Sequence, residues 1–565
     1  MLRLTAIVEC AMANIKINTR NFAKKLRKVA AGDTVLMSRD TYIKPLVLEG
    51  ITGTKEHPVI IRPDYGLRTG DVVLKSDIRE HEARMLGNRV AGKREQAGYY
   101  PTVGHLGEQA LLILRNCQFV VVQGLKFKGC WPTGIFIDDS MYVGVRDCHF
   151  EKGSIAIVAQ GRKCHDVVVE HCSWKQDKSG YLMWNRVPWD RIHGASNNGN
   201  DSGVSEDDYR YWDGDFFRAW NVHSNFTFRH NHIEDAFNGI HFFNSHDRLP
   251  PGRDANTLEF NGGRESAANV LIENNRFVRV RDNIFEPESH AWNWVIRHNT
   301  LLDCYRPFSF EFERAGWFYI YGNKGAFLNR PSGDFRGEDL NIKKSKRRRN
   351  PSLTKTKGPQ KNEGPIYFFN NSWFFEKGKG LFPKFQLGKL VHVNNASQFA
   401  NPEQARYFGG AGTLPSAIPF DPEKEIEAEG SRFTRRWGDF DIRMDGDVCN
   451  DVHFPDDYRA LGYGLGVSSK QATASFARVR RDQVNSIADL DFTSKSRDIR
   501  KKSVELVLEL PFGKPIKIDA GYNIGAVQKK NVYERLDGAF GFIPDLDWLP
   551  QDEPEASVFF AATSD

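Results

Sequence analysis

The chain contains 565 residues, and its 78 Lys and Arg residues exceed its 72 Asp and Glu residues by only six. So small an excess does not favour a nucleic acid as a partner. A chain of this length is too long for one compact core, but a solenoid can grow to any length because each repeat contacts only its neighbours.

The N-terminal segment has a short apolar run but lacks the cleavage site of a signal peptide. A basic amphipathic pattern follows, from about Ile15 to Ala30. We predict that residues 1–30 form an N-terminal cap with a short helix over the open end of a solenoid. No apolar stretch reaches the roughly 18 residues that a membrane span needs. We expect a soluble protein without membrane insertion, and its location is left open between extracellular and virion-associated.

The next segment, residues 30–66, reads AAGDTVLMSRDTYIKPLVLEGITGTKEHPVIIRPDYG. It resembles the opening of the β-helical polysaccharide lyases of the chondroitinase B and alginate lyase type, within the pectate lyase-like superfold. The matching residues are Gly32, Asp33, Thr34, Val35, Thr41, Tyr42, Gly50, Gly53, Thr54, Pro58, Val59 and Ile61. The resemblance implies carbohydrate processing on a parallel β-helix. It also implies a Lys and an Arg that transfer protons beside a calcium-binding Asn and Glu set, and we match no Lys of this chain to that position.

A repeat of 24 residues occupies the middle of the chain, with copies beginning at Asn269, Asn293 and Trp317. Each copy has apolar residues at its second and fourth positions and Asn at its seventh. The same strand pattern recurs at Phe119, Tyr142, Asp166, Asn225, Pro365 and Leu390. A short alternating strand at a period in the twenties is typical of a solenoid. We predict an all-β fold, a right-handed parallel β-helix over residues 31–400, with pairs such as Val270 and Ile272 in its core.

The seventh position of the repeat reads Leu125, Cys148, Cys172, Asn231, Asn275, Asn299, Asn323 and Asn371. Stacked Asn side chains turned inward can hydrogen-bond one another and the backbone at a tight bend. We expect an Asn ladder that begins where small apolar residues end.

Three insertions interrupt the repeat, at residues 175–224, 244–268 and 330–362. Aromatic faces bind sugar rings, and carboxylates and Arg bind hydroxyl and acid groups. The substrate-binding candidates from the first two insertions are Trp212, Asp215, Arg218, His246 and Arg248; for Phe216, Phe217 and Trp220 a small aromatic core inside the loop is an equal alternative. The third insertion is strongly basic from Lys343 to Lys357, which favours a solvated loop over a polyanion site. After residue 400 we predict a β-rich accessory or capping region, 401–565.

Candidate catalytic groups follow the Asn ladder in three rungs, which read NGIHFFN (238–244), DNIFEPE (282–288) and RPFSFEFE (306–313). Strand alternation predicts that Ile240, Ile284 and Phe308 point inward and that His241 and Ser309 point outward. Glu286 and Glu311 then need a local bulge, or the phase of the next strand, to point outward. The predicted catalytic residues are His241, Glu286, Arg306 and Glu311.

Two chemistries suit these residues, and a third interpretation is not catalytic. In a lyase on an acidic glycan, Arg306 binds the uronic acid carboxylate, His241 is the base, and calcium is held by carboxylates. The metal candidates are Asp282, Glu286 and Glu288, with Glu311 close by. In a glycoside hydrolase, Glu286 and Glu311 are acid and base, with Asp282 or Asp215 as substitutes. The third interpretation is a glycan-binding adhesin or tailspike-type depolymerase, which predicts a trimer, whereas a monomer favours a free enzyme.

Overall fold

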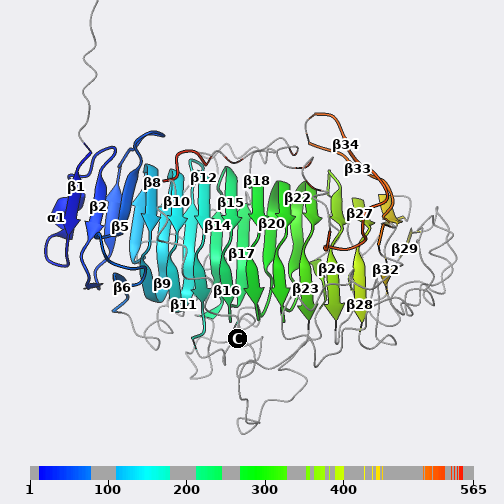
Figure 1. Ribbon diagram of the computed structural model, residues 1–565, viewed down its shortest axis with the longest axis horizontal. Helices are drawn as coiled ribbons and strands as arrows, with labels where there is room; N and C mark the ends of the chain where they lie inside the picture. The colour runs from blue at the N-terminus through cyan, green and yellow to red at the C-terminus, as the bar shows by residue number, and fades with distance from the viewer. Residues whose placement is uncertain are drawn as a thin grey trace, which may run out of the picture.

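The fold is the predicted right-handed parallel β-helix, a coil of strands stacked along one long axis (Figure 1). The computed structural model describes residues 12–77, 110–178, 192, 212–244, 267–327, 352–356, 362–375, 381, 389–399, 425–426, 435–436, 441–445, 448–449, 500–501, 503–511, 513–528, 533, 536, 540, 544 and 546–550. In the described residues the pairings along the coil are parallel, and the register is kept from rung to rung apart from shifts near Gly153 and Ser289. Within these ranges no helix is long and apolar enough to cross a membrane.

Three faces make up each turn of the coil. Face 1 carries the repeat strands: β1 (Asn14–Ile17), β2 (Thr34–Met37), β5 (Val59–Pro63), β8 (Gln118–Gln123), β10 (Met141–Arg146), β12 (His165–Glu170), β15 (Ser224–Arg229), β18 (Ala268–Glu273), β25 (Ile366–Phe369), β27 (Lys389–Val393) and β31 (Asp441–Asp445). Face 2 carries β3 (Thr41–Tyr42), β6 (Val73–Lys75), β13 (Ser173–Lys175), β16 (His232–Glu234), β19 (Arg276–Val278), β21 (Thr300–Leu302), β23 (Lys324–Phe327), β26 (Ser372–Phe375), β28 (Ala396–Phe399) and β32 (Val448–Cys449). Face 3 carries β4 (Leu46–Glu49), β7 (Leu112–Arg115), β14 (Asp215–Trp220), β17 (Asn238–Asn244) and β24 (Thr354–Thr356).

Four longer strands turn the corner between two faces. β9 (Lys126–Asp138) and β11 (His149–Gln160) run from face 2 to face 3. β20 (Phe285–Arg297) and β22 (Phe308–Tyr321) run from face 3 to face 1. Continuous strands therefore connect face 3 to face 2 at one corner and to face 1 at the other. This continuity fixes the register of the outward side chains of face 3 relative to the neighbouring rungs.

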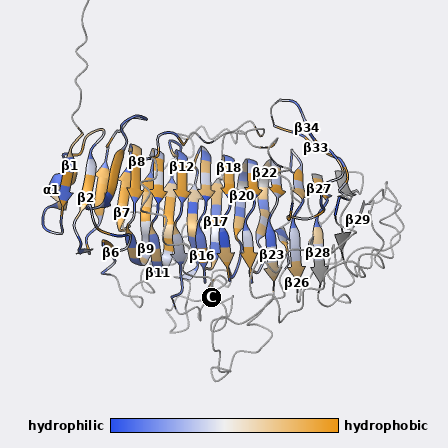
Figure 2. Ribbon diagram, in the orientation of Figure 1, coloured by the Kyte–Doolittle hydropathy of each residue, from blue (hydrophilic) through white to orange (hydrophobic). Residues whose placement is uncertain are grey.

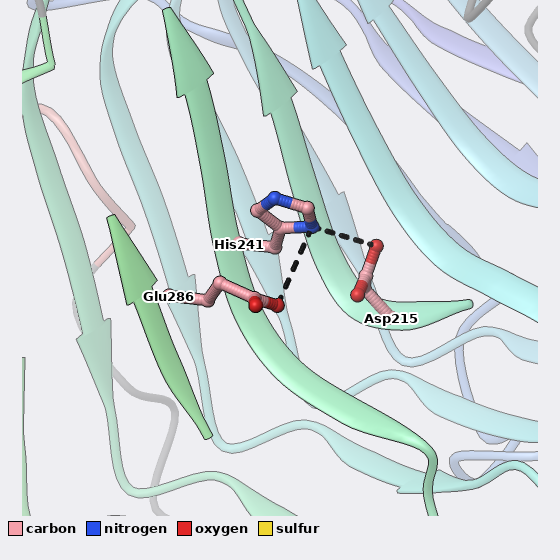
Figure 3. A group of neighbouring side chains, drawn as sticks. All are labelled: Asp215, His241 and Glu286. Carbon is pink, nitrogen blue, oxygen red and sulfur yellow. Dashed lines mark ion pairs between the residues drawn. The ribbon is translucent and has the colours of Figure 1, made fainter. Parts of the chain in front are cut away.

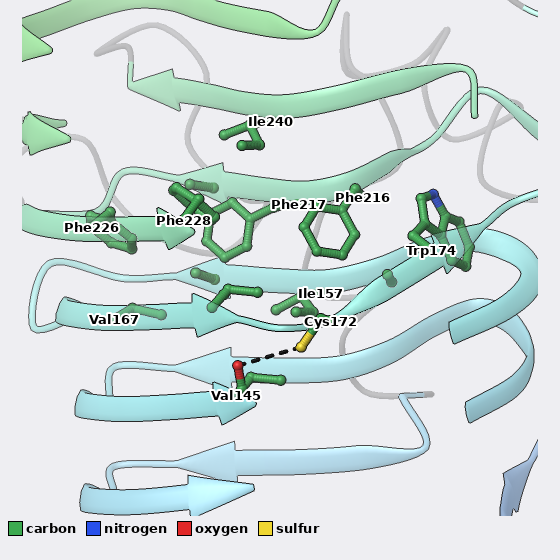
Figure 4. Packing of buried hydrophobic residues seen from close by; sticks show 14 of the residues in the cluster. Val145, Ile157, Val167, Cys172, Trp174, Phe216, Phe217, Phe226, Phe228 and Ile240 are labelled. Atoms are coloured by element: carbon green, nitrogen blue, oxygen red, sulfur yellow. Dashed lines mark hydrogen bonds between the residues drawn. The ribbon is translucent and has the colours of Figure 1, made fainter. Parts of the chain in front are cut away.

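The interior of the coil is apolar along its whole length, as the stripes of hydrophobic residues on the strands indicate (Figure 2). The predicted inward residues Val270, Ile272, Trp294 and Ile296 are all buried. Phe216 and Phe217, which we predicted in a loop, instead fill this main core beside Phe226, Phe228 and Trp174 (Figure 4). The reason is that Asp215–Trp220 is not part of an insertion but forms β14, paired with β11 and β17.

The predicted Asn ladder is present at the corner between face 1 and face 2. Asn275 illustrates it: its Oδ1 accepts from the backbone N and the Nδ2 of Asn231, both at 2.9 Å. Its Nδ2 donates to the Phe228 carbonyl at 2.9 Å and to Asn299 Oδ1 at 3.0 Å. The same pattern continues through Asn299, Asn323 and Asn371 to Asn395, and at the other end the Cys172 backbone N donates to Asn231. Each side chain thereby satisfies polar groups of two rungs.

The structure corrects the predicted boundaries of the coil. β1 already pairs with β2, so the first rung lies inside the segment predicted as a cap, and the helix is only α1 (Phe22–Leu26). The copy predicted at Leu390 begins one residue earlier, because Lys389 opens β27. At the other end β31 and β32 pair with β27 and β28, so the coil passes residue 400.

Part of the C-terminal region returns along the outside of face 1. The hairpin of β33 (Leu506–Leu508) and β34 (Ile516–Ile518) lies in the predicted β-rich region and packs on Tyr319 and Tyr367 of the coil. Farther along, Trp548 and Leu549 pack on Val121. Two other short strands, β29 (Glu425–Ile426) and β30 (Arg435–Arg436), pair with each other. The C-terminal region therefore covers an apolar side of face 1.

Candidate functional site

Polar side chains line up across the outer side of face 3. The register pairs Arg218 with His241 and His241 with Glu286, and the next two strands place Ser309 and Lys355 in the same row. Their strand neighbours Phe217, Ile240, Phe285 and Phe308 point into the core. A second outward row, two residues farther along the strands, contains Phe243, Glu288 and Glu311. Rungs are about 4.8 Å apart, so these two rows form one continuous patch.

A β-bulge sets the phase of Glu286. The backbone N of Ile284 and that of Phe285 both donate to the Pro307 carbonyl, at 3.1 and 2.7 Å. Two residues thus face one, and both Ile284 and Phe285 are buried in the core. Glu286 then faces outward, in register with His241. The bulge predicted for Glu286 is therefore present. The bulge predicted for Glu311 is not needed, because strand alternation from the inward Phe308 already turns Glu311 outward.

His241 lies among three carboxylates, and Figure 3 shows two of them, Asp215 and Glu286. Its Nδ1 is 3.7 Å from Asp215 Oδ2 and 3.8 Å from Glu286 Oε2, and its Nε2 is 3.4 Å from Glu288 Oε2. Burial opposes the charged ring, yet the carboxylates, Glu286 first, raise the pKa of His241 to about 10. The imidazole therefore carries a proton at neutral pH, which leaves no free lone pair for the general-base role that the sequence indicated.

The carboxyl groups of this patch differ in their affinity for a proton. Burial raises the pKa of Glu286 to about 7, although the charges of His241 and Lys355 work against that increase. For Glu288 burial is outweighed by a hydrogen bond and the charge of His241 and by the charge of Lys355, which lower its pKa to about 2. The pKa of the fully buried Asp215 is also lowered, because Arg218 and His241 outweigh its burial. At neutral pH Glu286 is close to half protonated while Glu288 and Asp215 are ionised.

Lys355 completes the patch, and the sequence analysis did not identify it. Its Nζ is 3.5 Å from Glu286 Oε1 and 3.4 Å from Glu311 Oε2, and it donates to Asn283 Oδ1 at 3.1 Å. The sequence places this lysine in a solvated basic loop within the insertion at 330–362. That assignment is wrong, because Thr354–Thr356 forms β24, pairs with β22, and keeps only 18% of the Lys355 side chain exposed. The alternation in Thr-Lys-Thr was its only signal in the sequence.

The remaining predicted residues lie near this patch or outside the described ranges. Arg218 makes an ion pair with Asp215, so it helps to position the carboxylate that lies beside His241. The Arg306 guanidinium lies over the Tyr305 ring, 4.8 Å from the ring centroid. The backbone carbonyl of Arg306 accepts a hydrogen bond from Asn283 Nδ2. Asp282 is buried at the turn before β20. Trp212 is fully buried against Trp131 and so is not a substrate-facing surface, whereas His246 and Arg248 lie outside the residues that the structure describes.

Among the residues that the structure describes, two groups of side chains have the composition of a metal site, with ligand atoms within 4.8 Å of one another in each group: Asp215, His241 and Glu286, and Glu286, Glu288 and Glu311. The first contains an imidazole, whereas calcium takes oxygen ligands. The second holds the Lys355 ammonium against Glu286 and Glu311. The residues present therefore do not fit calcium, because the chain itself supplies the positive charge.

No protein-family model matches this sequence, and no curated protein matches it. Among solved structures, the chain is similar to pectate lyase Pel9A, with 9% sequence identity over 75% of this chain and 88% of that chain and a TM-score of 0.36. It is similar to an exopolygalacturonase of Yersinia enterocolitica at 11% identity, over 71% of this chain and 76% of that chain, with a TM-score of 0.38. It is also similar to the Dettilon tailspike protein at 11% identity, over 69% of this chain and 64% of that chain, with a TM-score of 0.38. These similarities do not choose among the different activities.

Proposed function

We propose that this protein is a glycan-cleaving enzyme that hydrolyses glycosidic bonds with Glu286 as general acid and Glu288 as its ionised partner. The observation that carries the proposal is the opposite displacement of two neighbouring carboxyl pKa values, to about 7 for Glu286 and about 2 for Glu288. Glycosidases need one protonated and one ionised carboxyl group at the same pH. The choice of a glycan as substrate rests on this pair together with the resemblance of residues 30–66.

In the proposed reaction the Glu286 carboxyl donates its proton to the leaving glycosidic oxygen while the Glu288 carboxylate attacks the anomeric carbon. The bond to the leaving sugar breaks, and a glycosyl ester on Glu288 forms. A water molecule then attacks the same carbon, Glu286 takes its proton, and Glu288 leaves as a carboxylate. Oxygens of the two groups lie within 4.8 Å, which suits the short separation of retaining enzymes, about 5 Å, better than the wider spacing of inverting ones. We therefore expect retention of anomeric configuration.

Hydrolysis is supported better than elimination on a uronic acid. A lyase must neutralise the substrate carboxylate, so it needs basic groups that the protein does not already pair. Here Lys355 contacts Glu286 and Glu311, and Arg218 pairs with Asp215. His241 lies among three carboxylates. Carboxyl groups outnumber basic groups among these contacts, which disfavours an anionic sugar at this patch.

The test is incubation with a panel of neutral and acidic polysaccharides, with and without a chelator, while reducing ends and the ultraviolet absorbance of unsaturated sugars are recorded together. We expect reducing ends to rise without absorbance, and a chelator to have no effect. Absorbance rising with the reducing ends would replace hydrolysis by elimination. A glycan that binds without cleavage would leave the adhesin interpretation, and a trimer in sedimentation analysis would then strengthen it.

The pH dependence follows from the protonation state of Glu286. Because the acid must carry its proton, kcat/KM on a natural glycan should fall as pH rises through about 7, the pKa of Glu286. No acidic limb from Glu288 is expected above about pH 3, since its pKa is about 2. The measurement is a pH profile of kcat/KM, with an aryl glycoside of a very good leaving group as control. That substrate needs no acid, so an alkaline limb of equal size for both substrates would contradict the assignment.

A further inference from the structure

The ammonium group of Lys355 occupies the kind of position that proteins give to a divalent cation. Three oxygens surround its Nζ: Asn283 Oδ1 at 3.1 Å, Glu311 Oε2 at 3.4 Å and Glu286 Oε1 at 3.5 Å. Amide and carboxylate oxygens are the ligands that calcium prefers. Glu288 adds a third carboxylate, since its oxygens lie within 4.8 Å of those of Glu286 and Glu311.

A second observation also points to a cation at this place. Ser309 is in the outward row between Glu286 and Lys355, because Phe308 and Phe310 on either side of it are in the core. The Ser309 side chain is fully buried, and its Oγ has no hydrogen-bond partner within the part of the chain that the structure describes. A buried hydroxyl without a partner is rare in folded proteins and is an oxygen ready to accept a further contact. Ser309 therefore offers a neutral oxygen in the same outward row as Lys355, between Lys355 and Glu286.

We propose that Lys355 is a built-in cation that takes the place of a divalent metal ion, and that removing its ammonium converts the surrounding oxygens into a divalent-cation site. The chain covalently supplies one positive charge, whereas a bound calcium ion would supply two. The Lys355 charge explains how the carboxylates of Glu286, Glu288 and Glu311 can lie as close together as they do. The proposal concerns binding alone, so it stands or falls separately from the hydrolytic reaction.

The experiment titrates CaCl2 into the full-length protein by isothermal calorimetry at mildly alkaline pH and records thermal stability with and without calcium. Wild type should show no saturable binding. Lys355→Ala should bind one calcium ion with a Kd of about 10 µM to 1 mM, within the range of protein calcium sites, and calcium should raise its melting temperature. Lys355→Arg keeps the charge and should bind none. Lys126→Ala, which breaks an ion pair with Glu151 on face 2, is the matched control and should bind none.

The calcium titrations can support or overturn the proposal. Loss of calcium binding when Glu311→Gln is added to Lys355→Ala would place the ion among these residues. Calcium binding by wild type as tight as that of Lys355→Ala would overturn the proposal, as would a folded Lys355→Ala that binds no calcium. If Lys355→Ala does not fold alone, calcium in the refolding buffer should restore it, and failure of that rescue counts against the proposal as well.

Discussion

Replacing Glu286 by Gln is expected to lower kcat/KM on the natural glycan by about 10³-fold, the range that general acid catalysis contributes. Gln has the same shape and keeps a polar group in the patch, but its amide does not transfer a proton to the leaving oxygen. The measurement is steady-state kinetics on the polysaccharide that the wild type cleaves, with circular dichroism to confirm the fold. An aryl glycoside with a very good leaving group should lose far less activity, because it departs without a proton.

The matched control for this variant is Glu273→Gln. Glu273 lies in β18 on face 1, where its carboxylate pairs with Arg297 at 2.7 Å, so the same chemical change is made in the same coil away from face 3. Its kcat/KM should stay within about twofold of wild type, because Glu273 lies on face 1 and pairs with Arg297 rather than with a group of the patch. A Glu286→Gln enzyme with more than a tenth of the wild-type rate would sink the assignment of the acid.

The partner carboxylate gives a different signature. Glu288→Gln removes the group that attacks the anomeric carbon, so the natural glycan and the aryl glycoside should both lose activity. Rescue of Glu286→Gln by the activated substrate, without rescue of Glu288→Gln, separates the acid from the nucleophile. Equal loss in both variants on both substrates would mean that the two residues do not hold these separate roles.

The coil could be predicted from the sequence because its signal is repeated. Every rung must turn the same positions inward. The need for an apolar residue at one such position is therefore visible three times, at Val270, Trp294 and Phe318. The Asn ladder adds a polar residue at a fixed place, where Asn275 and Asn299 each join two rungs. A single strand of this kind would be ambiguous, but a run of them at one period is not.

The site was predicted less well, because the residues that make it belong to exceptions in the repeat. The bulge at Ile284 and Phe285 shifts the phase of one strand by one residue, and no periodic pattern marks a single extra residue. β24 is only three residues long and follows a long insertion, so Lys355 was grouped with its basic neighbours in sequence. β14 falls within a predicted insertion for a related reason. Its segment, which contains Phe216 and Phe217, lacks the Asn that marks the repeat strands of face 1.

The Asn ladder gives the second large effect. Asn275→Ala should lower the free energy of unfolding by about 4 kcal/mol, because several buried polar groups lose a partner and each costs about 1–3 kcal/mol. The backbone N of Asn231 loses its acceptor and the Phe228 carbonyl loses its side-chain donor, while Asn231 Nδ2 and Asn299 Oδ1 each lose one of two partners. The measurement is the shift of the urea unfolding midpoint. Because neighbouring rungs contact one another directly, we expect the loss to lower the stability of the whole coil.

Asn274→Gly is the control next to it in sequence. Asn274 is exposed and has a φ of 54°, a left-handed conformation that Gly adopts without strain, so its replacement should change the free energy of unfolding by less than about 0.5 kcal/mol. Asn275→Asp tests the donor alone, since it keeps the acceptor for Asn231 but brings a carboxylate against the Phe228 carbonyl and Asn299 Oδ1. If Asn275→Ala were no more destabilising than Asn274→Gly, the ladder would be a consequence of the packed coil rather than a cause of its stability, and the apolar core would carry the fold alone.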